Sequence, residues 1–329
     1  MRKLGKILGR IIASLVGIVA VIWWLGPYEP VDLSAEFEPR KFGEGVQVYF
    51  ESIESRYQDI TPGTEKRVVW AGQSETRTPI SILYLHGFSA TSEEIRPVPD
   101  RVARELGANL VFTRLRGHGR GGEAMAEATV ADWMYDLAEG LAAARATGDK
   151  VVVLATSTGA TLAAVAAVNP DLARDVAAMV LISPNFGLHD PASALLTLPA
   201  VRWWGPLVAG ETQAFQPQND AHARYWTSSY PTVALLPMAA LVKVVSALDF
   251  GGAQMPVLFY LSDDDAVVSP DISRRIANDW GGSATVHAVT MGEGDDASSH
   301  VIAGDILSPG QTDTAVATIL NWLTEQGIR

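Results

Sequence analysis

Ser157 is the residue whose surroundings most clearly predict chemistry. It lies in the run Leu154-Ala155-Thr156-Ser157-Thr158-Gly159-Ala160, where an apolar stretch meets a series of small residues. A strand, Ser-x-Gly and then a helix is the context of a nucleophile elbow, a tight turn that projects the serine hydroxyl above a sheet. Gly159 would let the helix and strand approach closely, and the helix N-terminus would favour developing negative charge. The same run also fits a serine that only caps a helix.

An acid and a base follow further along the chain. Asp263, Asp264 and Asp265 come directly after an apolar run, and His300 lies in a loop between the last predicted strand and the last predicted helix. A carboxylate at the end of a sheet strand can orient an imidazole, which can then take the proton of a serine hydroxyl. The three aspartates cannot all be buried, because adjacent like charges repel.

The segment 84–89, YLHGFS, predicts a site for the charge that such a reaction develops. A glycine at a strand end frees the next amides to point at a ligand, so the backbone N–H groups of Phe88 and Thr158 are candidate oxyanion donors. His86 is interpreted as a structural histidine that holds this loop. The remaining acids near the site, Glu293, Asp295 and Asp296, have no EF-hand spacing. We expect no metal and no cofactor.

Short apolar runs alternate with helical periodicity from about residue 67 to the C-terminus. This alternation predicts an α/β fold with a mostly parallel sheet that has helices on both faces. Between 186 and 252 the alternation breaks, and this insert contains no strand-like run. The predicted strands are 67–71, 80–85, 109–115, 150–156, 177–183, 256–261 and 285–290, and the predicted helices are 46–60, 94–106, 130–147, 158–168, 270–280 and 312–326.

Composition excludes several classes of protein. The 329 residues are 48% hydrophobic and 19% charged, which is too apolar for a disordered chain. The net charge is −12, and the four basic residues among the first ten leave a net charge of −16 on the rest. A chain with this much negative charge repels the phosphate backbone of nucleic acids. We therefore expect no nucleic-acid partner. Because there is no cysteine, disulfides and thiolate metal clusters are excluded.

The N-terminus predicts a membrane anchor. Residues 11–28 carry no charge, and at 1.5 Å per residue they reach roughly 27 Å, close to the thickness of a bilayer core. Basic residues precede this span, Trp23, Trp24 and Tyr28 lie at its far end, and acids follow it. The positive-inside rule places the N-terminus in the cytoplasm and the body outside, which is the periplasm if the cell is Gram-negative. A cleaved signal peptide is the alternative. We expect an anchor at 1–28, a linker at 29–44 and one domain at 45–329.

Six motifs in order give the chain a family resemblance, from about Val68 to the C-terminus. They are YLHGFS (84–89), TRLRGHG (113–119), DWMYDL (132–137), ATSTG (155–159), SDDDAVVSP (262–270) and SSHVIAGD (298–305). The chain resembles α/β hydrolases of the serine esterase, monoacylglycerol lipase and serine-aminopeptidase-like group. The resemblance implies a Ser157–Asp265–His300 triad with oxyanion donors at Phe88 and Thr158. Ala155 and Ser262 depart from the family pattern, which has glycine at both positions.

The resemblance also implies a cap domain, inserted after the sixth strand, for which residues 186–252 are the candidate. Its aromatic residues Trp203, Trp204, Tyr225 and Trp226 could line an apolar acyl pocket over Ser157. We therefore expect a serine hydrolase that cleaves esters or lipids with an apolar acyl chain. The acids at 263–265 and 293–296 should make the mouth of the site negative and disfavour anionic substrates.

Other functions remain open at this point. An aminopeptidase would need a carboxylate in the cap to hold an α-amine, and Glu211, Asp190 and Asp220 are the candidates. An acyltransferase could use the same core, because a fold does not determine its substrate. A catalytically silent, membrane-tethered binding protein would be expected to have lost a triad or oxyanion position. The sequence does not predict an oligomeric state.

Overall fold

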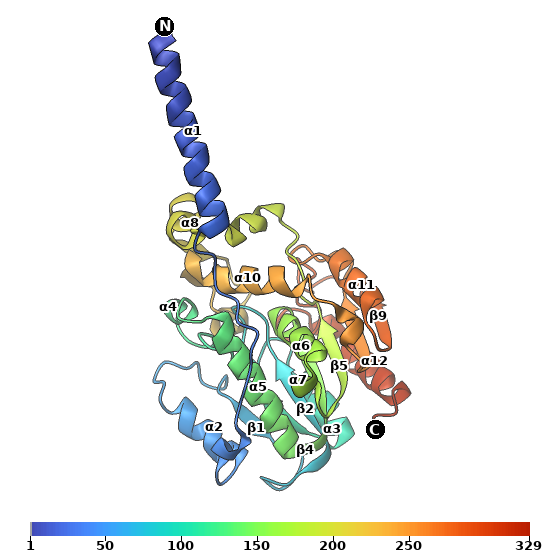
Figure 1. The fold of residues 1–329 in the computed structure, drawn as a ribbon. Helices are drawn as coiled ribbons and strands as arrows, with labels where there is room; N and C mark the ends of the chain where they lie inside the picture. The colour runs from blue at the N-terminus through green and yellow to red at the C-terminus, as the bar shows by residue number, and fades with distance from the viewer. Residues whose placement is uncertain (1) are drawn as a thin grey trace.

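The computed structural model describes residues 2–329, with side chains from residue 5 onward. This part of the chain contains a seven-stranded sheet with the order β1-β3-β2-β4-β5-β8-β9 (Figure 1). β1 runs antiparallel to β3 and every other neighbouring pair is parallel, which confirms the predicted sheet. The strands are β1 (Arg67–Val69), β2 (Thr78–Leu85), β3 (Asn109–Phe112), β4 (Gly148–Thr156), β5 (Val176–Ile182), β8 (Val257–Leu261) and β9 (Ala284–Ala288).

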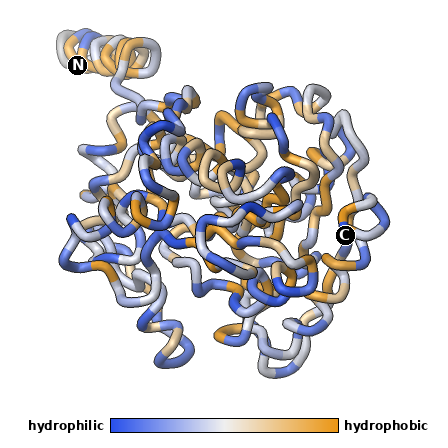
Figure 2. The backbone as a smooth tube through the Cα atoms, turned by 90° about the horizontal axis from the view of Figure 1, so that it is seen from below, coloured by the Kyte–Doolittle hydropathy of each residue, from blue (hydrophilic) through white to orange (hydrophobic). Residues whose placement is uncertain are grey.

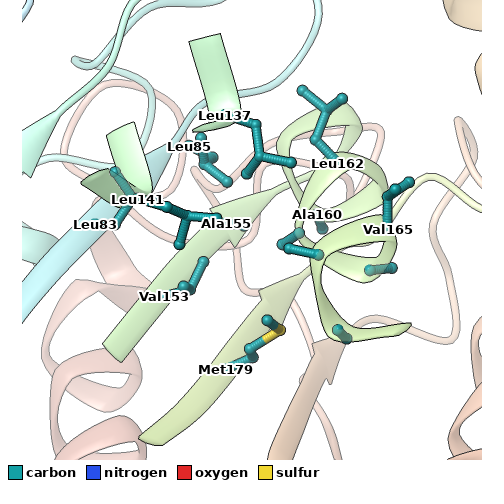
Figure 3. Packing of buried hydrophobic residues seen from close by; sticks show 14 of the residues in the cluster. Leu83, Leu85, Leu137, Leu141, Val153, Ala155, Ala160, Leu162, Val165 and Met179 are labelled. Atoms are coloured by element: carbon teal, nitrogen blue, oxygen red, sulfur yellow. The ribbon is translucent and has the colours of Figure 1, made fainter. Parts of the chain in front are cut away.

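Successive residues of the central strands face opposite sides of the sheet and form two apolar layers. In β2, Leu83 and Leu85 belong to the layer on one face, whereas Ile82 and Tyr84 belong to the layer on the other. The two-residue period of a strand produces this alternation. Figure 3 shows the first layer, where these leucines and residues of β4 meet Leu137, Leu141, Leu162 and Val165.

Helices cover both faces of the sheet. α5 (Val130–Thr147) and α6 (Thr158–Val168) pack on the first layer, and α3 (Val98–Leu106) and α12 (Thr312–Glu325) pack on the second. α5 begins where predicted because Thr129 and Asp132 form a reciprocal capping box. The remaining helices of the domain are α2 (Val46–Glu54), α4 (Gly122–Met125), α7 (Pro170–Ala173), α11 (Pro270–Asp279), and the 3₁₀ turns η1 (Pro39–Phe42), η4 (Phe250–Gly252) and η5 (Pro309–Gln311).

Two helix boundaries differ from the prediction. The apolar period from residue 46 suggested a helix to residue 60, but α2 ends at Glu54 and the next residues form turns. The helix expected from residue 94 begins at Val98, with Pro97 as its N-cap. Proline is tolerated in the first turn of a helix. It prevents the helix from starting a turn earlier, because it has no N–H to donate and its ring clashes with the preceding turn. The turn that remains at 93–97 carries a side chain of the site described below.

The segment expected to be a linker packs against the domain. Residues 31–37 run extended from the base of α1 (Arg2–Leu25) along α5 (Figure 1). Every second side chain, at Val31, Leu33, Ala35 and Phe37, packs on the core, and the intervening residues are exposed. The Phe37 ring lies 5.8 Å from the ring of Tyr135 in α5. This packed strap, residues 31–37, joins α1 to the domain without a free tether.

The insert lies over the carboxyl edge of the sheet and contains strands that the sequence did not predict. It follows β5, the fifth strand along the chain, one strand earlier than expected. β6 and β7 pair antiparallel, and their short sequences, TQA and SYP, have no apolar alternation that could have indicated a strand. The elements of the insert are η2 (Pro191–Thr197), α8 (Val201–Ala209), β6 (Thr212–Ala214), α9 (Asp220–Tyr225), β7 (Ser229–Pro231), η3 (Thr232–Ala234) and α10 (Leu235–Val245).

Two truncations separate α1 from the strap. A chain of residues 29–329 keeps the strap, so we expect it to fold with the stability of the intact domain. A chain of residues 39–329 loses the packing of Leu33 and Phe37, and burial of a large apolar side chain contributes about 1.5–3 kcal/mol. We expect its free energy of unfolding to be lower by at least about 2 kcal/mol, measured by urea denaturation. Equal unfolding midpoints for the two chains would show that the strap does not stabilise the domain.

Candidate active site

Ser157 occupies a strained turn between β4 and α6. Its φ is 51° and its ψ is −117°, a backbone conformation that costs energy for a residue with a side chain. The surrounding bonds hold this turn, since the Ser157 N–H donates to Ile182 and the Ser157 carbonyl accepts from Thr161 and Asn185. A Cβ at Gly159 would lie 2.4 Å from the Leu85 carbonyl oxygen, so a glycine is required there. The fold thus presents the hydroxyl at the edge of the sheet.

His300 and Asp265 lie beside this serine. His300 Nε2 is 3.1 Å from Ser157 Oγ, and His300 Nδ1 is 2.8 Å from Asp265 Oδ2. The other carboxylate oxygen of Asp265 accepts hydrogen bonds from the Val267 and Val268 amides. The three residues follow the carboxyl ends of β4, β8 and β9, which share one edge of the parallel sheet. The structure therefore brings together three residues separated by up to 143 positions.

The contacts of His300 determine how it can act. With Nδ1–H donated to Asp265, the Nε2 lone pair faces the Ser157 hydroxyl, so the imidazole can accept the serine proton. Burial would lower the pKa of His300, but its hydrogen bond and attraction to Asp265 outweigh burial and raise the pKa. A proton taken from Ser157 is thus stabilised on the ring while the serine attacks an electrophile.

The three consecutive aspartates have different environments. Asp265 is buried, whereas Asp263 and Asp264 are exposed, and Asp263 forms an ion pair with Arg274 at 2.6 Å. The expectation that at least one of the three is solvated agrees with this arrangement. Of the three, Asp265 is the one that reaches the imidazole.

The two predicted oxyanion donors have free amides next to Ser157. Within residues 2–329, neither the Phe88 N–H nor the Thr158 N–H donates to a protein acceptor. The Gly87 carbonyl oxygen lies 2.8 Å from His86 Nδ1, and His86 Nε2 accepts from the Leu115 amide, so Nδ1 carries the proton. Because the Gly87 carbonyl and the Phe88 N–H belong to one planar trans peptide, His86 also sets the direction of that N–H.

Glu94 is a residue of this site that sequence reasoning missed. Its carboxylate accepts hydrogen bonds from the Gly87 amide at 2.7 Å and from the Tyr84 hydroxyl at 3.1 Å. The Tyr84 hydroxyl is also 3.1 Å from Thr156 Oγ1, next to the serine. Burial raises the pKa of Glu94 to about 7, although these bonds and the charge of His300 act in the opposite direction. Glu93 and Glu94 are adjacent residues of the same type, so no feature of the sequence distinguishes one from the other.

Asp296 holds the loop that carries His300. It is buried, and its carboxylate accepts hydrogen bonds from the His300 and Val301 amides at 3.1 and 3.0 Å. Burial alone would raise the pKa of Asp296, but hydrogen bonds from Ser298, Val301 and Gln218 hold it below its ordinary value. Asp265 and Asp296 are thus both buried with backbone amides bound to their carboxylates, whereas Asp263, Asp264 and Glu293 are exposed, and the negative potential expected at the mouth stays a prediction.

The four cap aromatics do not form one pocket. Trp203 is 66% exposed on the outside of α8, so it does not line a closed pocket over Ser157 as expected. Adjacent residues of a helix point in directions about 100° apart, and Trp204 accordingly faces inward and donates to the Pro199 carbonyl. Tyr225 and Trp226 lie near residues 86–89, which we call the oxyanion loop. The contact is made by the Thr227 amide, which donates to the Ser89 carbonyl. The ring of Tyr230 contacts Phe88 at 5.4 Å.

No metal site appears in the part of the chain with described side chains. No group of three or more His, Cys, Asp or Glu side chains comes together there in an arrangement that could hold an ion. The groups gathered at Ser157 are its hydroxyl, an imidazole bonded to a carboxylate, and two backbone amides without a protein acceptor among the described residues, which could serve as a nucleophile, a base and two oxyanion donors.

Known proteins resemble this chain in sequence and in fold. Residues 78–291 match the family model described as serine aminopeptidase, S33. A thermostable monoacylglycerol lipase of Bacillus sp. (strain H-257) is 27% identical over 199 residues, which are 58% of this chain and 73% of that protein.

Two solved structures are similar in fold. A structure of the metagenome-derived lipolytic enzymes LipS and LipT has a TM-score of 0.64 at 19% identity, covering 81% of this chain and 99% of that one. A soluble variant of monoglyceride lipase from Saccharomyces cerevisiae has a TM-score of 0.59 at 13% identity, covering 80% and 91%.

Substitution of the orienting acid should change the titration of His300. In Asp265→Asn the buried imidazole loses the charge that stabilises its protonated form, so we expect the pKa of His300 to fall. Asp264→Asn removes an exposed charge that does not contact the ring and should leave the pKa nearly unchanged. Imidazole NMR signals followed against pH measure both. An equal response to the two substitutions would show that Asp265 does not control the ring.

Glu94 should control the reactivity of Ser157 through the oxyanion loop. Glu94→Ala leaves the buried Gly87 amide without an acceptor, at a cost of about 1–3 kcal/mol. We expect the rate of Ser157 labelling by a fluorophosphonate to fall about tenfold or more, because a drop of 1.4 kcal/mol in transition-state stabilisation is about tenfold. Glu94→Gln keeps an acceptor oxygen and should retain most of the rate. If Glu94→Ala stays folded and labels as fast as the parent, Glu94 only packs.

Proposed function

Because the chain belongs to the serine aminopeptidase S33 family of α/β hydrolases and has their fold, we propose that it hydrolyses carboxylic esters with an apolar acyl chain through an acyl-enzyme on Ser157. The observation that carries this proposal is the hydrogen-bonded series from Ser157 through His300 to Asp265. The site holds a nucleophile whose proton has a positioned acceptor, and that acceptor has its own orienting partner.

The proposed mechanism has two halves. In the first, Ser157 Oγ attacks the ester carbonyl carbon while its proton moves to His300 Nε2, and the Phe88 and Thr158 amides stabilise the oxyanion. The tetrahedral intermediate breaks its bond to the alkoxy oxygen, which leaves as the alcohol with the proton from His300. In the second half, His300 takes a proton from water as the water attacks the acyl carbon, and the carboxylic acid leaves with Ser157 restored.

Two observations support an apolar ester as substrate. The Bacillus relative is named as a monoacylglycerol lipase, and the cap of this chain has a nearly wholly apolar cavity of about 160 Å³ between η2, α8 and η3. Between Arg202 and Arg224 the sequence has no Arg or Lys that could hold an anionic head group. A neutral ester of the monoacylglycerol kind fits these features.

The other candidate functions have weaker support. An aminopeptidase needs a carboxylate near the substrate amine, but Asp190, Glu211 and Asp220 are exposed, and Asp190 accepts a hydrogen bond from the Ala192 amide at the start of η2. A catalytically silent binding protein does not require the strained Ser157 turn or the hydrogen-bonded His300. Turnover of amino-acyl anilides faster than esters would favour a peptidase instead.

We also propose that α1 anchors the enzyme in a membrane with the domain outside the cytoplasm. Gly5–Leu25 is long and apolar enough to cross a bilayer, and the body of the domain buries none of it. The basic residues before the span and the tryptophans at its far end support the orientation. A cleaved signal sequence would have similar apolar character, and the length of the mature protein distinguishes the two.

Loss of the Ser157 hydroxyl tests the proposed function. We expect Ser157→Ala to lower kcat/KM for p-nitrophenyl esters by several orders of magnitude, because the nucleophile and base act as one unit. Fluorophosphonate labelling should disappear while the unfolding midpoint is unchanged. Ser55→Ala, at an exposed serine after α2, is the control and should behave as the parent. Retention of more than about a tenth of the rate in Ser157→Ala would refute the proposal.

A further inference from the structure

The outer surface of the cap displays large apolar side chains. Leu195, Trp203, Leu207 and Val208 are 49, 66, 85 and 73% exposed. Arg202 is the one charged residue between 191 and 210 in the sequence, and it is paired with Glu29 at 2.6 Å. We call these four apolar residues the cap patch. Trp203 and Leu207 are four residues apart in α8, so they lie on one face of the helix, and adjoining exposed apolar side chains mark an interaction site in a soluble domain.

The cap patch lies where α1 meets the domain. The Ala200 amide donates to the Pro27 carbonyl at 2.8 Å, and Arg202 binds Glu29, so the residues just after α1 are bonded to the start of α8. A Cβ added to Gly26 would lie 2.8 Å from the Pro199 side chain, which shows how closely the two segments approach. In Figure 1, α8 is at the base of α1.

This junction limits what can cover the cap patch. If α1 spans a bilayer, its end at Leu25 reaches the membrane surface, and Trp23 and Trp24 lie at the interface. The hydrogen bond to Pro27, two residues later, holds the first turn of α8 at nearly the same depth. A folded protein partner would have to fit between α8 and the lipid. The bilayer itself is the surface within reach.

The chemistry of the patch agrees with that location. Trp203 has an amphipathic ring of the kind found at membrane interfaces, and Leu207 and Val208 offer apolar area without charge. Because α1 holds the cap patch beside the bilayer, the patch meets lipid at a high effective concentration. Four side chains are then enough for a stable contact. The apolar cavity beneath the patch is lined by Leu195 and Val208 of the patch and by Trp204 and Leu236.

We propose that the cap patch lies in the interface of the same bilayer that α1 spans, so that lipid esters reach the enzyme from the membrane and place an acyl chain in the cavity between η2, α8 and η3. The inference rests on the proposed anchor and the proposed ester hydrolysis. It adds a fixed orientation: the cap faces the lipid, and α2, at the far end of the domain from α1, faces water (Figure 1).

A cysteine probe tests this orientation, and the natural chain has no cysteine to interfere. Leu207→Cys and the control Val48→Cys, on α2 and 50% exposed, are labelled with the environment-sensitive dye NBD. Both full-length chains are reconstituted in phosphatidylcholine–phosphatidylglycerol vesicles with and without doxyl-labelled lipid. We expect blue-shifted, doxyl-quenched emission at position 207 and neither effect at position 48.

A substrate comparison tests the consequence. Trp203→Gln combined with Leu207→Gln changes two exposed residues outside the cavity lining and the site. We expect it to lower turnover of a long-chain monoacylglycerol embedded in vesicles several-fold, with turnover of soluble p-nitrophenyl butyrate unchanged. An equal rate on both substrates, relative to the parent, would overturn the inference.

The remaining outcomes are also decisive. Unquenched NBD at position 207 in vesicle-bound protein overturns the inference, as does protein that fails to float with vesicles. Concentration-dependent shielding of position 207 in residues 29–329 without vesicles would assign the patch to a second copy of the chain. If the parent chain does not hydrolyse p-nitrophenyl butyrate, the proposed function is refuted instead, since that assay requires no membrane.

Discussion

The close approach of α6 to the end of β2 is the constraint on which the site depends. A side chain at Gly159 would collide with the carbonyl oxygens of Leu85 and His86, so the glycine allows the helix to begin directly under the oxyanion loop. That contact lets α6 begin directly after the strained turn at Ser157. The buried layers of the sheet supply the stability that keeps this strain in place.

Three buried carboxyl groups surround one imidazole, and backbone amides make this possible. Asp265 accepts two amide hydrogen bonds and Asp296 accepts several, whereas Glu94 accepts one amide and one phenol. The pKa values of the acids reflect the number of hydrogen bonds that they accept. Asp296, which accepts several, has a lowered pKa, whereas Glu94, which accepts two, has a raised pKa. Asp265 holds the imidazole of His300, Asp296 holds the backbone of the loop that carries His300, and Glu94 holds the oxyanion loop.

The N-terminal segment is mechanically part of the domain. The strap packs alternate side chains on the core beside α5, and the residues before it are bonded to α8. α1 is therefore not joined to the domain by a free linker, because the residues that follow it are bonded to α8 of the cap and then pack on the core. This arrangement connects the orientation of a membrane anchor to the surface through which a substrate would approach.

Local patterns in the sequence determined much of this protein. The alternation of β-branched runs with helical periods predicted the sheet, its covering helices and the start of α5, and motif order together with the family resemblance indicated Ser157, Asp265 and His300. The helical and strand periods depend on residues close in the chain, and each motif can be recognised from its own local sequence. Tertiary structure alone decided the role of Glu94 over Glu93, the inward direction of Asp296, the packed strap and the outward direction of Trp203. Each of those depends on which distant backbone amide or apolar surface a side chain meets, and burial and hydrogen bonding are not encoded in residue type or short-range spacing.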